Sequence, residues 1–422
     1  MEGTRPIHVV VLGAGFGGLA FCRAFKHPRA RITLIDRQNH HLFQPLLYQV
    51  ATAGLSAPEI AQPIRSVFRD RPEVEVCLDE VIDLQPDQKR VIGRSRTWDY
   101  DYLVVALGGR TSYFGHPEWE AFAPGLKSLD DALRIRRNLL LAFEQAENTT
   151  DEVERRRLMT TVIVGGGPTG VELAGAIAEL TRVVLKNDFR RIDPTQARCV
   201  LVQSGPRLLN EYAEELSQNA RESLEKMGVE VRTGSRVQNI TQGCVDLGTE
   251  KIEAECLIWA AGVAASPLTE KLGVPVDRGG RLKPEPDLSL PGRPEVFLVG
   301  DLVSMSDKDG QMVPGIAPAA MQAAKHVAEQ LTDELDGQAD ARQPFDYWDK
   351  GTMATIGRSA AVAQYRSLRL TGWPAWLAWL LIHLLFLVGF RNRAAVLLQW
   401  IYGYFAFKRG ARIIFGRDAR RD

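Results

Sequence analysis

The chain has 422 residues, of which 45% are hydrophobic and 25% are charged. A chain of this size and composition can bury a large core in roughly two or three domains, which excludes a disordered protein. Basic and acidic residues balance at 52 each, but residues 366–422 hold ten Lys and Arg against two Asp. The tail therefore carries +8 and the rest of the chain −8. A basic tail interleaved with apolar runs favours an anionic lipid surface over nucleic acid.

The cysteines are scattered along the chain, and no two of them form a CxxC pair. This spacing predicts small buried apolar side chains, and it offers neither a redox pair nor a zinc site, so no metal is expected. The chain enters its first apolar run within about six residues of Met1, which leaves no room for a secretory signal. We therefore expect the folded body to stay in the cytoplasm. The cysteines are Cys22, Cys77, Cys199, Cys244 and Cys256.

A glycine-rich turn follows the first apolar run, residues 9–12. The run predicts a buried parallel strand, and the glycines allow a tight turn, close approach of the backbone to a pyrophosphate and close packing of the next helix. The N-terminus of that helix presents backbone N–H groups and a partial positive charge. The residues expected to bind a dinucleotide here are Gly13, Ala14, Gly15, Phe16, Gly17 and Gly18.

Residues 32–36 predict the second strand, which ends in Asp36, 23 residues beyond Gly13. After such a turn, an acid at this place accepts hydrogen bonds from the adenosine ribose. An Asp at a strand end also commonly serves as a cap or turn residue, so this role stays open beside the first. A further strand, residues 102–107, ends at Gly108, where a backbone without a side chain can lie near a cofactor.

A charged, helix-like segment, residues 128–157, leads to a second copy of the same pattern in residues 162–170. Its first glycine, Gly165, lies 152 residues after Gly13, which is about one domain length. Each copy follows an apolar strand and precedes a helix, as nucleotide binding requires. Glycine-rich turns in an ordinary parallel sheet are the alternative. Two copies predict two nucleotides, with a flavin in the first and a nicotinamide dinucleotide in the second.

The second copy lacks the acid of the first. Residues 198–203 predict its second strand, and Gln203 stands where an NAD site usually carries Asp or Glu. Without a carboxylate to repel a 2′-phosphate, NADPH is not excluded. Arg207 would favour that phosphate, although a solvated surface arginine is the simpler interpretation.

Two later apolar strands also end in small residues. Residues 256–261 lead to Gly262, and residues 296–299 lead to Gly300 and Asp301. Ligands of parallel sheets lie at the carboxyl ends of the strands. The chain order therefore predicts a first domain that is interrupted by the second and completed after it.

The tail contains two apolar runs, residues 373–390 and 394–407, separated by Arg391 and Arg393. Eighteen residues are borderline for a transmembrane helix and fourteen are too few, because a span needs about 20. Aromatic residues and the Lys408–Arg409 pair favour a monotopic, partly embedded helix pair at a membrane interface. A true span and a buried dimer interface remain the alternatives. The aromatic residues are Trp373, Trp376, Trp379, Trp400, Tyr402 and Tyr404.

Four segments resemble a known family, the two-dinucleotide flavoprotein reductases, and within it the type II NADH dehydrogenases, which are single-chain, non-pumping NADH:quinone oxidoreductases. The resemblance covers nearly the whole chain. Its first and last segments separate the chain from soluble relatives such as ferredoxin reductases. The segments are NHHLFQPLLYQVA (residues 39–51), GGGPTGVELAG (165–175), DKGTMATIGR (349–358) and GFRNR (389–393).

The resemblance implies an α/β fold with two Rossmann-like dinucleotide-binding domains, one inserted in the other, and a C-terminal membrane-associated helical segment. The expected boundaries are 1–118 and 291–343 for the FAD-binding domain, 119–290 for the NADH-binding domain and 344–422 for the membrane-anchoring and dimerisation region. The implied cofactor is a non-covalent FAD, with Asp301 toward its ribityl chain. Further residues expected near the two nucleotides are Arg37, Gln44, Val81, Ala106 and Ala317 for FAD, and Gly165, Gly167, Gly170, Gln203 and Gly262 for NADH.

Two residues are expected to act in catalysis. Glu172 corresponds to the family's acid near the nicotinamide and the flavin, and an acid in the first turn of a helix also suits the helix dipole. Gln322 corresponds to the last residue of the family's flavin and quinone helix, often written AQxAxQ. Pro318 replaces the first Gln of that motif, which puts a quinone contact there in doubt, although proline suits a helix start.

The implied reaction passes a hydride from NADH to the flavin and then two electrons to a membrane quinone, in ping-pong order. Proton pumping is not expected, because the apolar runs hold no chain of ionisable groups. The resemblance also implies a homodimer at the cytoplasmic face of the membrane. One rival is sulfide:quinone oxidoreductase, whose chemistry needs a reactive cysteine pair. Another is a nicotinamide-sensing flavoprotein whose main role is to bind a partner.

Overall fold

The computed structural model describes residues 5–308, 310–338, 342–406 and 410–414 of the chain. The fold is α/β, and the chain divides into two compact units, each assembled from separate stretches of sequence. The first unit contains Met1–Leu42, Ala61–Arg110 and Val263–Lys350. The second unit contains Phe43–Ile60, Thr111–Gly262 and Gly351–Asp422. The first unit is interrupted twice by stretches of the second and is completed after them.

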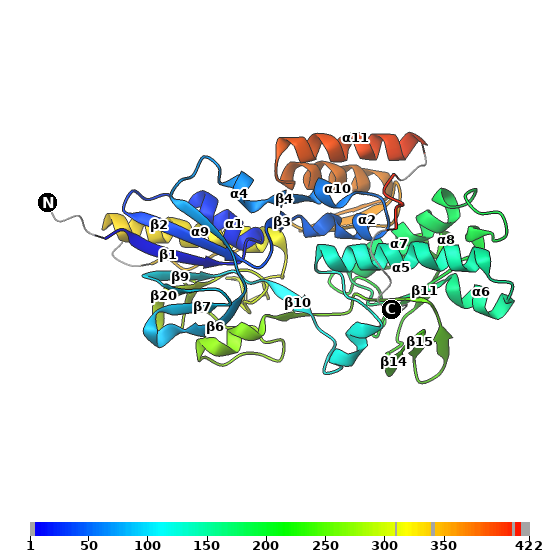
Figure 1. The fold of residues 1–422 in the computed structure, drawn as a ribbon, viewed down its shortest axis with the longest axis horizontal. Coiled ribbons are helices and arrows are strands. Elements are labelled where there is room, and N and C mark those ends of the chain that lie inside the picture. Colours follow the sequence, from blue (N-terminus) through cyan, green and yellow to red (C-terminus); the bar gives the residue numbers. More distant parts are fainter. Residues whose placement is uncertain (1–4, 309, 339–341, 407–409, 415–422) are drawn as a thin grey trace. The chain divides into compact units, whose positions relative to one another are not determined.

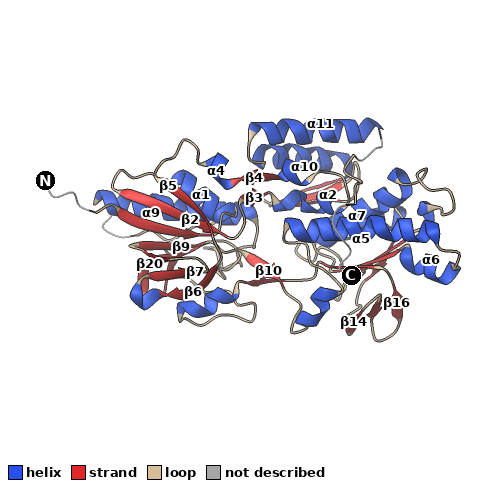
Figure 2. Ribbon diagram, in the orientation of Figure 1, coloured by secondary structure: helices blue, strands red, loops and turns tan. Residues whose placement is uncertain are grey.

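The first unit is built on a six-stranded sheet in the order β19-β20-β9-β1-β2-β5 (Figures 1 and 2). Its strands run parallel except for the β19–β20 pair, and Val9 of β1 lies opposite Ile32 and Tyr102. Because both faces of such a sheet are covered, its central strands are continuous apolar runs. The strands are β1 (Ile7–Leu12), β2 (Ala30–Asp36), β5 (Val74–Leu78), β9 (Tyr102–Val105), β19 (Ser289–Leu290) and β20 (Arg293–Leu298).

Helices α1 (Phe16–Ala24) and α9 (Ala317–Asp336) pack against each other beside this sheet (Figure 1). Helix α9 has Pro318 in its first turn, as its sequence predicts, and ends at Gly337, whose φ is 70°. Its buried face is mostly alanine, which lets its backbone approach its neighbours closely. Smaller elements of this unit are β3 (His40–Leu42), β4 (Ala61–Pro63), α4 (Ile64–Val67), β6 (Val81–Gln85), β7 (Arg90–Gly93) and β8 (Thr97–Asp99).

The second unit contains a four-stranded parallel sheet in the order β13-β12-β11-β17. The predicted charged segment before it forms α5 (Leu129–Asn148), which starts with a capping box between Ser128 and Asp131, and α6 (Glu152–Leu158). The other main elements are β11 (Thr160–Val164), α7 (Pro168–Glu179), β12 (Arg198–Val202), α8 (Glu214–Lys226), β13 (Val229–Arg232), β14 (Asn239–Thr241), β15 (Cys244–Asp246), β16 (Lys251–Glu253) and β17 (Cys256–Trp259). Two short strands, β10 (Gly109–Thr111) and β18 (Val263–Ala265), pair where the chain passes between the units.

The tail belongs to the second unit and begins as a three-stranded antiparallel sheet of β21 (Thr352–Thr355), β22 (Ala361–Tyr365) and β23 (Leu368–Thr371). Strand β21 packs against α7, and helix α10 (Gly372–Phe386) packs on the tail sheet and against α11 (Phe390–Ala406). The same unit holds α2 (Leu47–Ala51) and α3 (Ala57–Ile60), with α2 packed against α5 and α7 and α3 against α11. Among the described helices, none combines the length and apolar character that crossing a bilayer demands.

Every strand predicted from an apolar run is present, although some ends differ. The predicted strand 102–107 ends at Val105, because the chain turns at Gly108, whose φ is 65°. The predicted strand 198–203 ends at Val202, which places Gln203 just beyond the edge of the sheet. The expected Lys408–Arg409 anchor lies outside the described residues.

Candidate functional site

The backbone of the first glycine turn has a conformation and close contacts that only glycine allows. Gly13 has a φ of 94°, and a Cβ added there would lie 2.5 Å from the carbonyl oxygen of Ala106. A Cβ on Gly18 would lie 1.8 Å from the carbonyl oxygen of Gly13. Glycine is therefore required at both positions. A Cβ on Gly15 would meet nothing within 4 Å, and no side chain caps α1, so the turn is open on the side where a pyrophosphate binds in such folds.

Asp36 holds this turn in place. Its Oδ2 accepts a hydrogen bond from the Ala14 backbone N–H at 2.6 Å, and its Oδ1 accepts one from the Gln38 N–H at 2.7 Å. Burial raises the pKa of Asp36, and these two amide donors oppose that rise. The carboxyl thus has the turn-holding role considered from the sequence. A carboxylate has more lone pairs than these two amides use, so the ribose role stays a prediction.

Segments far apart in sequence meet at the carboxyl edge of the first sheet. A Cβ on Gly17 would lie 3.1 Å from Val299 and 3.7 Å from the Cβ of Ala106. A Cβ on Gly109 would lie 3.3 Å from the Cβ of Asp301, and one on Gly315 would lie 3.7 Å from its Oδ1. The predicted residues Ala106 and Asp301 are therefore grouped around the first turn, together with the start of α9.

The remaining residues predicted for the first site lie at its margin. Arg37 is exposed beside Asp36, and Val81 is two residues after Asp79, whose N–H donates to the Asp36 carbonyl at 3.0 Å. Ala317 begins α9. Gln322 on the same helix pairs with backbone: its Nε2 donates to the Trp348 carbonyl and its Oε1 accepts the Trp348 N–H, both at 3.1 Å. This amide anchors the segment before the tail, and its quinone contact stays a prediction.

The second glycine turn repeats the first. Gly165 has a φ of 114°, and its added Cβ would lie 2.5 Å from the carbonyl oxygen of Ala260. A Cβ on Gly170 would lie 1.8 Å from the carbonyl oxygen of Gly165, whereas one on Gly167 would meet nothing within 4 Å. No side chain caps α7, whose first residue is Pro168. The two turns therefore present the same open surface ahead of a helix N-terminus.

Gln203 takes the place of Asp36 in the second turn. Its Oε1 accepts a hydrogen bond from the Gly166 N–H at 2.9 Å, so a neutral amide does what a carboxyl does in the first turn. The Arg207 guanidinium donates to the carbonyls of Asn210 at 2.9 Å and Tyr212 at 3.0 Å, and so binds the loop that follows the strand.

Two other predicted residues of the second unit have contacts within that unit. A Cβ on Gly262 would lie 2.6 Å from the ring of Phe114, so this glycine is needed for packing. The Gln44 side chain donates to the Lys127 carbonyl at 3.4 Å. Neither contact tests the predicted nucleotide role.

Glu172 is buried on α7, with 9% of its surface exposed. The prediction that it lies in the first turn of this helix is wrong, because α7 begins at Pro168 and its first turn contains no acid. Burial raises the pKa of Glu172 to about 8, and a hydrogen bond from the Thr355 backbone amide opposes the rise. A carboxyl with this pKa holds its proton at neutral pH, which is a common property of acid–base groups.

The surroundings of Glu172 do not follow from the sequence. Tyr48 is buried and its Oη lies 2.9 Å from Thr355 Oγ1, while Gln49 joins Tyr48 to Trp400 of α11. Tyr48 belongs to a segment that carries the family resemblance, which was the only available signal. Nothing local predicts that Thr355 and Trp400 come to the same place.

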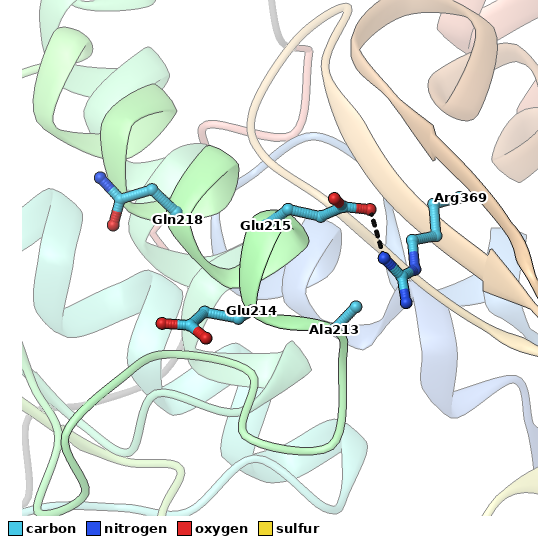
Figure 3. A pocket seen from close by; sticks show the side chains of 5 residues that line it. All are labelled: Ala213, Glu214, Glu215, Gln218 and Arg369. Atoms are coloured by element: carbon cyan, nitrogen blue, oxygen red, sulfur yellow. Dashed lines mark hydrogen bonds and ion pairs between the residues drawn. The ribbon is translucent and has the colours of Figure 1, made fainter.

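An open hollow of about 700 Å³ lies at the N-terminus of α8, beside the tail sheet (Figure 3). Arg369 of β23 and Glu215 of α8 form an ion pair of 2.8 Å across it. None of the residues predicted for the two nucleotide sites lines this hollow. Its lining residues are Ala213, Glu214, Glu215, Gln218 and Arg369.

All five cysteines are free, and four are buried. Cys22, which lies on α1 after the first turn, is fully buried, and burial raises the pKa of its thiol. Such a thiol is unreactive. Cys22 therefore does not supply the reactive thiol beside the first turn that sulfide oxidation would need.

Two dinucleotide turns in one α/β chain define a class of oxidoreductase that couples two nucleotides. In agreement, residues 7–324 match the family described as Pyridine nucleotide-disulphide oxidoreductase. Over 429 aligned residues the chain is 44% identical to the Type II NADH:quinone oxidoreductase Ndh of Mycobacterium tuberculosis, covering 98% of this chain and 92% of that protein. It is likewise 44% identical to NdhA of the same organism, over 96% of this chain and 89% of that protein.

The fold agrees with this match. The structure of NDH2 from Plasmodium falciparum in complex with NADH superimposes with a TM-score of 0.89 at 21% identity, covering 98% of this chain and all of that one. The chain belongs to the type II NADH:quinone oxidoreductases of the pyridine nucleotide-disulphide oxidoreductase family.

Proposed function

We propose that this chain, a type II NADH:quinone oxidoreductase, holds a non-covalent FAD at its first glycine turn and binds NADH at its second. The observation that carries the proposal is the repeated turn, with one open glycine ahead of an uncapped helix in each unit. Each turn fits a pyrophosphate, because a Cβ at Gly15 or Gly167 would occupy only open space. The backbone can thus approach a phosphate without a side chain between them.

When bound, a flavin accepts two electrons as a hydride from NADH and passes them to a quinone. The residues of the chain supply binding and position. The N-terminus of α1 favours the negative charge of the flavin nucleotide, and Asp36 has lone pairs left for ribose hydroxyls while it holds the turn. The N-terminus of α7 gives NADH the same phosphate site, with Gln203 as a neutral neighbour.

Glu172 is proposed as the proton-holding group of the reaction. Reduction of a quinone takes up protons as well as electrons, and a buried carboxyl whose pKa is near 8 carries a proton at neutral pH. Its position on α7, seven residues after Gly165, keeps the carboxyl on the helix that starts at the NADH turn. Gln322 is proposed to contribute to the quinone site through α9.

The tail is proposed to attach the enzyme to the cytoplasmic face of the membrane without crossing it. Large apolar side chains of α10 and α11 are exposed, which is unusual for a soluble surface and typical of a membrane or protein contact. A quinone would then arrive from the lipid. Homodimer formation through the tail is a separate prediction. The exposed residues are Trp373, Leu377, Leu381, Ile382, Leu385, Phe386, Leu397, Leu398, Ile401 and Tyr402.

Stopped-flow spectroscopy of the purified protein tests the proposal. We expect NADH to bleach the absorbance of a bound flavin rapidly and a soluble quinone to restore it, and a parallel series with NADPH measures the selectivity of the second turn. A colourless protein that takes up no flavin would remove the FAD assignment. Quinone reduction far slower than bleaching would instead favour the nicotinamide-sensing flavoprotein.

A further inference from the structure

A chain of hydrogen bonds runs from the tail helix α11 to the side chain of Thr355 within the second unit, and the backbone of Thr355 contacts Glu172. Trp400 Nε1 lies 2.8 Å from Gln49 Oε1, and Gln49 Nε2 lies 3.0 Å from Tyr48 Oη. Tyr48 Oη lies 2.9 Å from Thr355 Oγ1. The backbone amide of Thr355 then donates to the Glu172 carboxyl. The chain thus brings together α11, α2, β21 and α7, which are widely separated in sequence.

The donor at the tail end fixes the direction of the two bonds that the Gln49 side chain makes. An indole N–H can only donate, so the Gln49 amide must turn its oxygen to Trp400 and its NH₂ to Tyr48. Tyr48 Oη accepts from Gln49, and its own hydrogen is then available for Thr355 Oγ1. The Trp400 and Gln49 donors therefore point from α11 toward Tyr48.

This chain holds Thr355, whose backbone amide favours the ionised form of the Glu172 carboxyl. Tyr48 and Thr355 are buried, and Gln49 and Trp400 are half-buried, so the bonds lie in a medium of low dielectric constant where aligned hydrogen bonds strengthen one another. The Thr355 backbone amide presents its positive end to Glu172 and opposes the effect of burial, and Tyr48 holds the side chain of the same residue. Aromatic rings reinforce the arrangement. The ring centroid of Trp379 on α10 lies 6.5 Å from that of Tyr48, in an edge-on arrangement, and 5.8 Å from that of Trp400.

We propose that Tyr48 and Gln49 are positioning residues that couple the docking of α11 to the protonation of Glu172. With α11 docked, the Trp400 N–H orients the chain and the carboxyl ionises more readily. Without that N–H, the Gln49 amide is free to turn over and the alignment is lost. The inference rests on the proposed role of Glu172 and makes the tail a regulator of the same site.

Among the groups around α7, this chain of hydrogen bonds is the main influence on Glu172 that a change in the tail can alter. The phenols of Tyr48 and Tyr212 interact electrostatically with the carboxyl, and burial raises the pKa of both, so they stay neutral. Strand β21 carries no charged residue. The charged or titratable residues on the other elements packed against α7 are Arg182, Arg198, Cys199, Glu214, Glu215, Arg221, Glu222, Glu225, Lys226, Glu230 and Arg232, with Glu179 on α7 itself.

Infrared titration of the resting holoenzyme tests the coupling without turnover. The band of the protonated Glu172 carboxyl is assigned by its loss in Glu172→Gln, and its midpoint is measured in each variant. Trp400→Phe keeps an aromatic ring but removes the distant N–H, and we expect it to raise the midpoint by about half a pH unit. Tyr48→Phe breaks the chain beside Thr355 and is expected to raise it by about one unit.

Tyr365→Phe, which removes a phenol from the exposed end of β22, is the matched control and should leave the midpoint unchanged. Gln49→Met gives a second break of similar size if Trp400→Phe fails to retain flavin. If Trp400→Phe, Gln49→Met and Tyr48→Phe all titrate with the same midpoint as the parent, the coupling is overturned. The absence of a titrating band would also overturn it. If Glu172→Gln leaves turnover unchanged while Trp400→Phe still moves the band, the proposed role of Glu172 fails and the coupling stands.

Discussion

The two glycine turns share one backbone but carry different charges. In each, the first glycine has a positive φ and lies against a carbonyl of a neighbouring segment, and a side chain at the end of the second strand accepts an N–H from the turn. That acceptor is a carboxyl in Asp36 and a neutral amide in Gln203. The turn therefore needs an acceptor oxygen and not a charge, which leaves the charge available to select the ligand.

A second difference lies on the helix that follows each turn. Seven residues after the first glycine, α1 has Ala20 and α7 has Glu172. The repeated fold thus offers the same position twice, and of the two turns the second is followed by a buried acid there. The two copies share their backbone shape and differ in charge at two positions, that of Asp36 or Gln203 and that of Ala20 or Glu172.

The largest effect is expected from Glu172→Gln, which removes the acid that the first helix lacks at the same position. The pKa of Glu172 is raised in the folded state, so the folded chain binds a proton that the unfolded chain releases above about pH 4.5. Stability contributed by this group is present below that pH and is lost as the pH rises through about 8. We expect the free energy of unfolding, measured in urea, to fall by on the order of a few kcal/mol from acidic to alkaline pH in the parent. The fall should be much smaller in Glu172→Gln. An equal loss in both would contradict the shift.

Alanine at the two open glycines should separate the ligands of the two turns. Gly15 and Gly167 have φ values of −68° and −75°, which alanine adopts freely, so both variants should fold. Each new methyl group would project into the proposed phosphate site and weaken binding by about tenfold to a hundredfold. We expect Gly15→Ala to lose flavin on gel filtration, whereas Gly167→Ala keeps flavin and has a higher KM for NADH. The reverse pattern would exchange the two nucleotides.

A charge added to the second turn should make it resemble the first. Gln203→Glu keeps an acceptor oxygen for the Gly166 N–H and adds the repulsion of a 2′-phosphate. We expect kcat/KM for NADPH to fall by about tenfold or more, with a much smaller change for NADH. Flavin content serves as the control for folding. Equal changes for both nucleotides would show that this position does not face the ribose.

The smallest effect is expected from Arg207→Ala. Because this guanidinium binds the carbonyls of Asn210 and Tyr212, its loss should cost about 1 kcal/mol of stability and leave the ratio of NADPH to NADH activity nearly unchanged. Thermal unfolding and steady-state kinetics measure the two quantities. A selective loss of NADPH activity would instead give Arg207 a role at the 2′-phosphate.

Local pattern predicts much of this molecule, and long-range packing accounts for the remainder. The glycine turns and their strands follow from apolar runs and glycine spacing, because these depend on residues close in sequence. The environment of Glu172 does not follow from the local sequence, because its amide donor belongs to Thr355, which is 183 residues away. The helix start at Pro168 also displaced Glu172 from the predicted first turn. Residue roles toward FAD, NADH and quinone remain predictions.

The division of the chain bears on its synthesis. The stretch Phe43–Ile60 belongs to the second unit although it is made before most of the first, and the first unit is not complete until Lys350. During translation the stretch Thr111–Gly262 can assemble its own parallel sheet from neighbouring segments. The sheet that contains the earlier strands β1 and β2 cannot be completed until β20 has been made. Ribosome-bound chains long enough for residue 262 to have left the exit tunnel, but not β20, should therefore resist protease in the stretch Thr111–Gly262 and not in the earlier one.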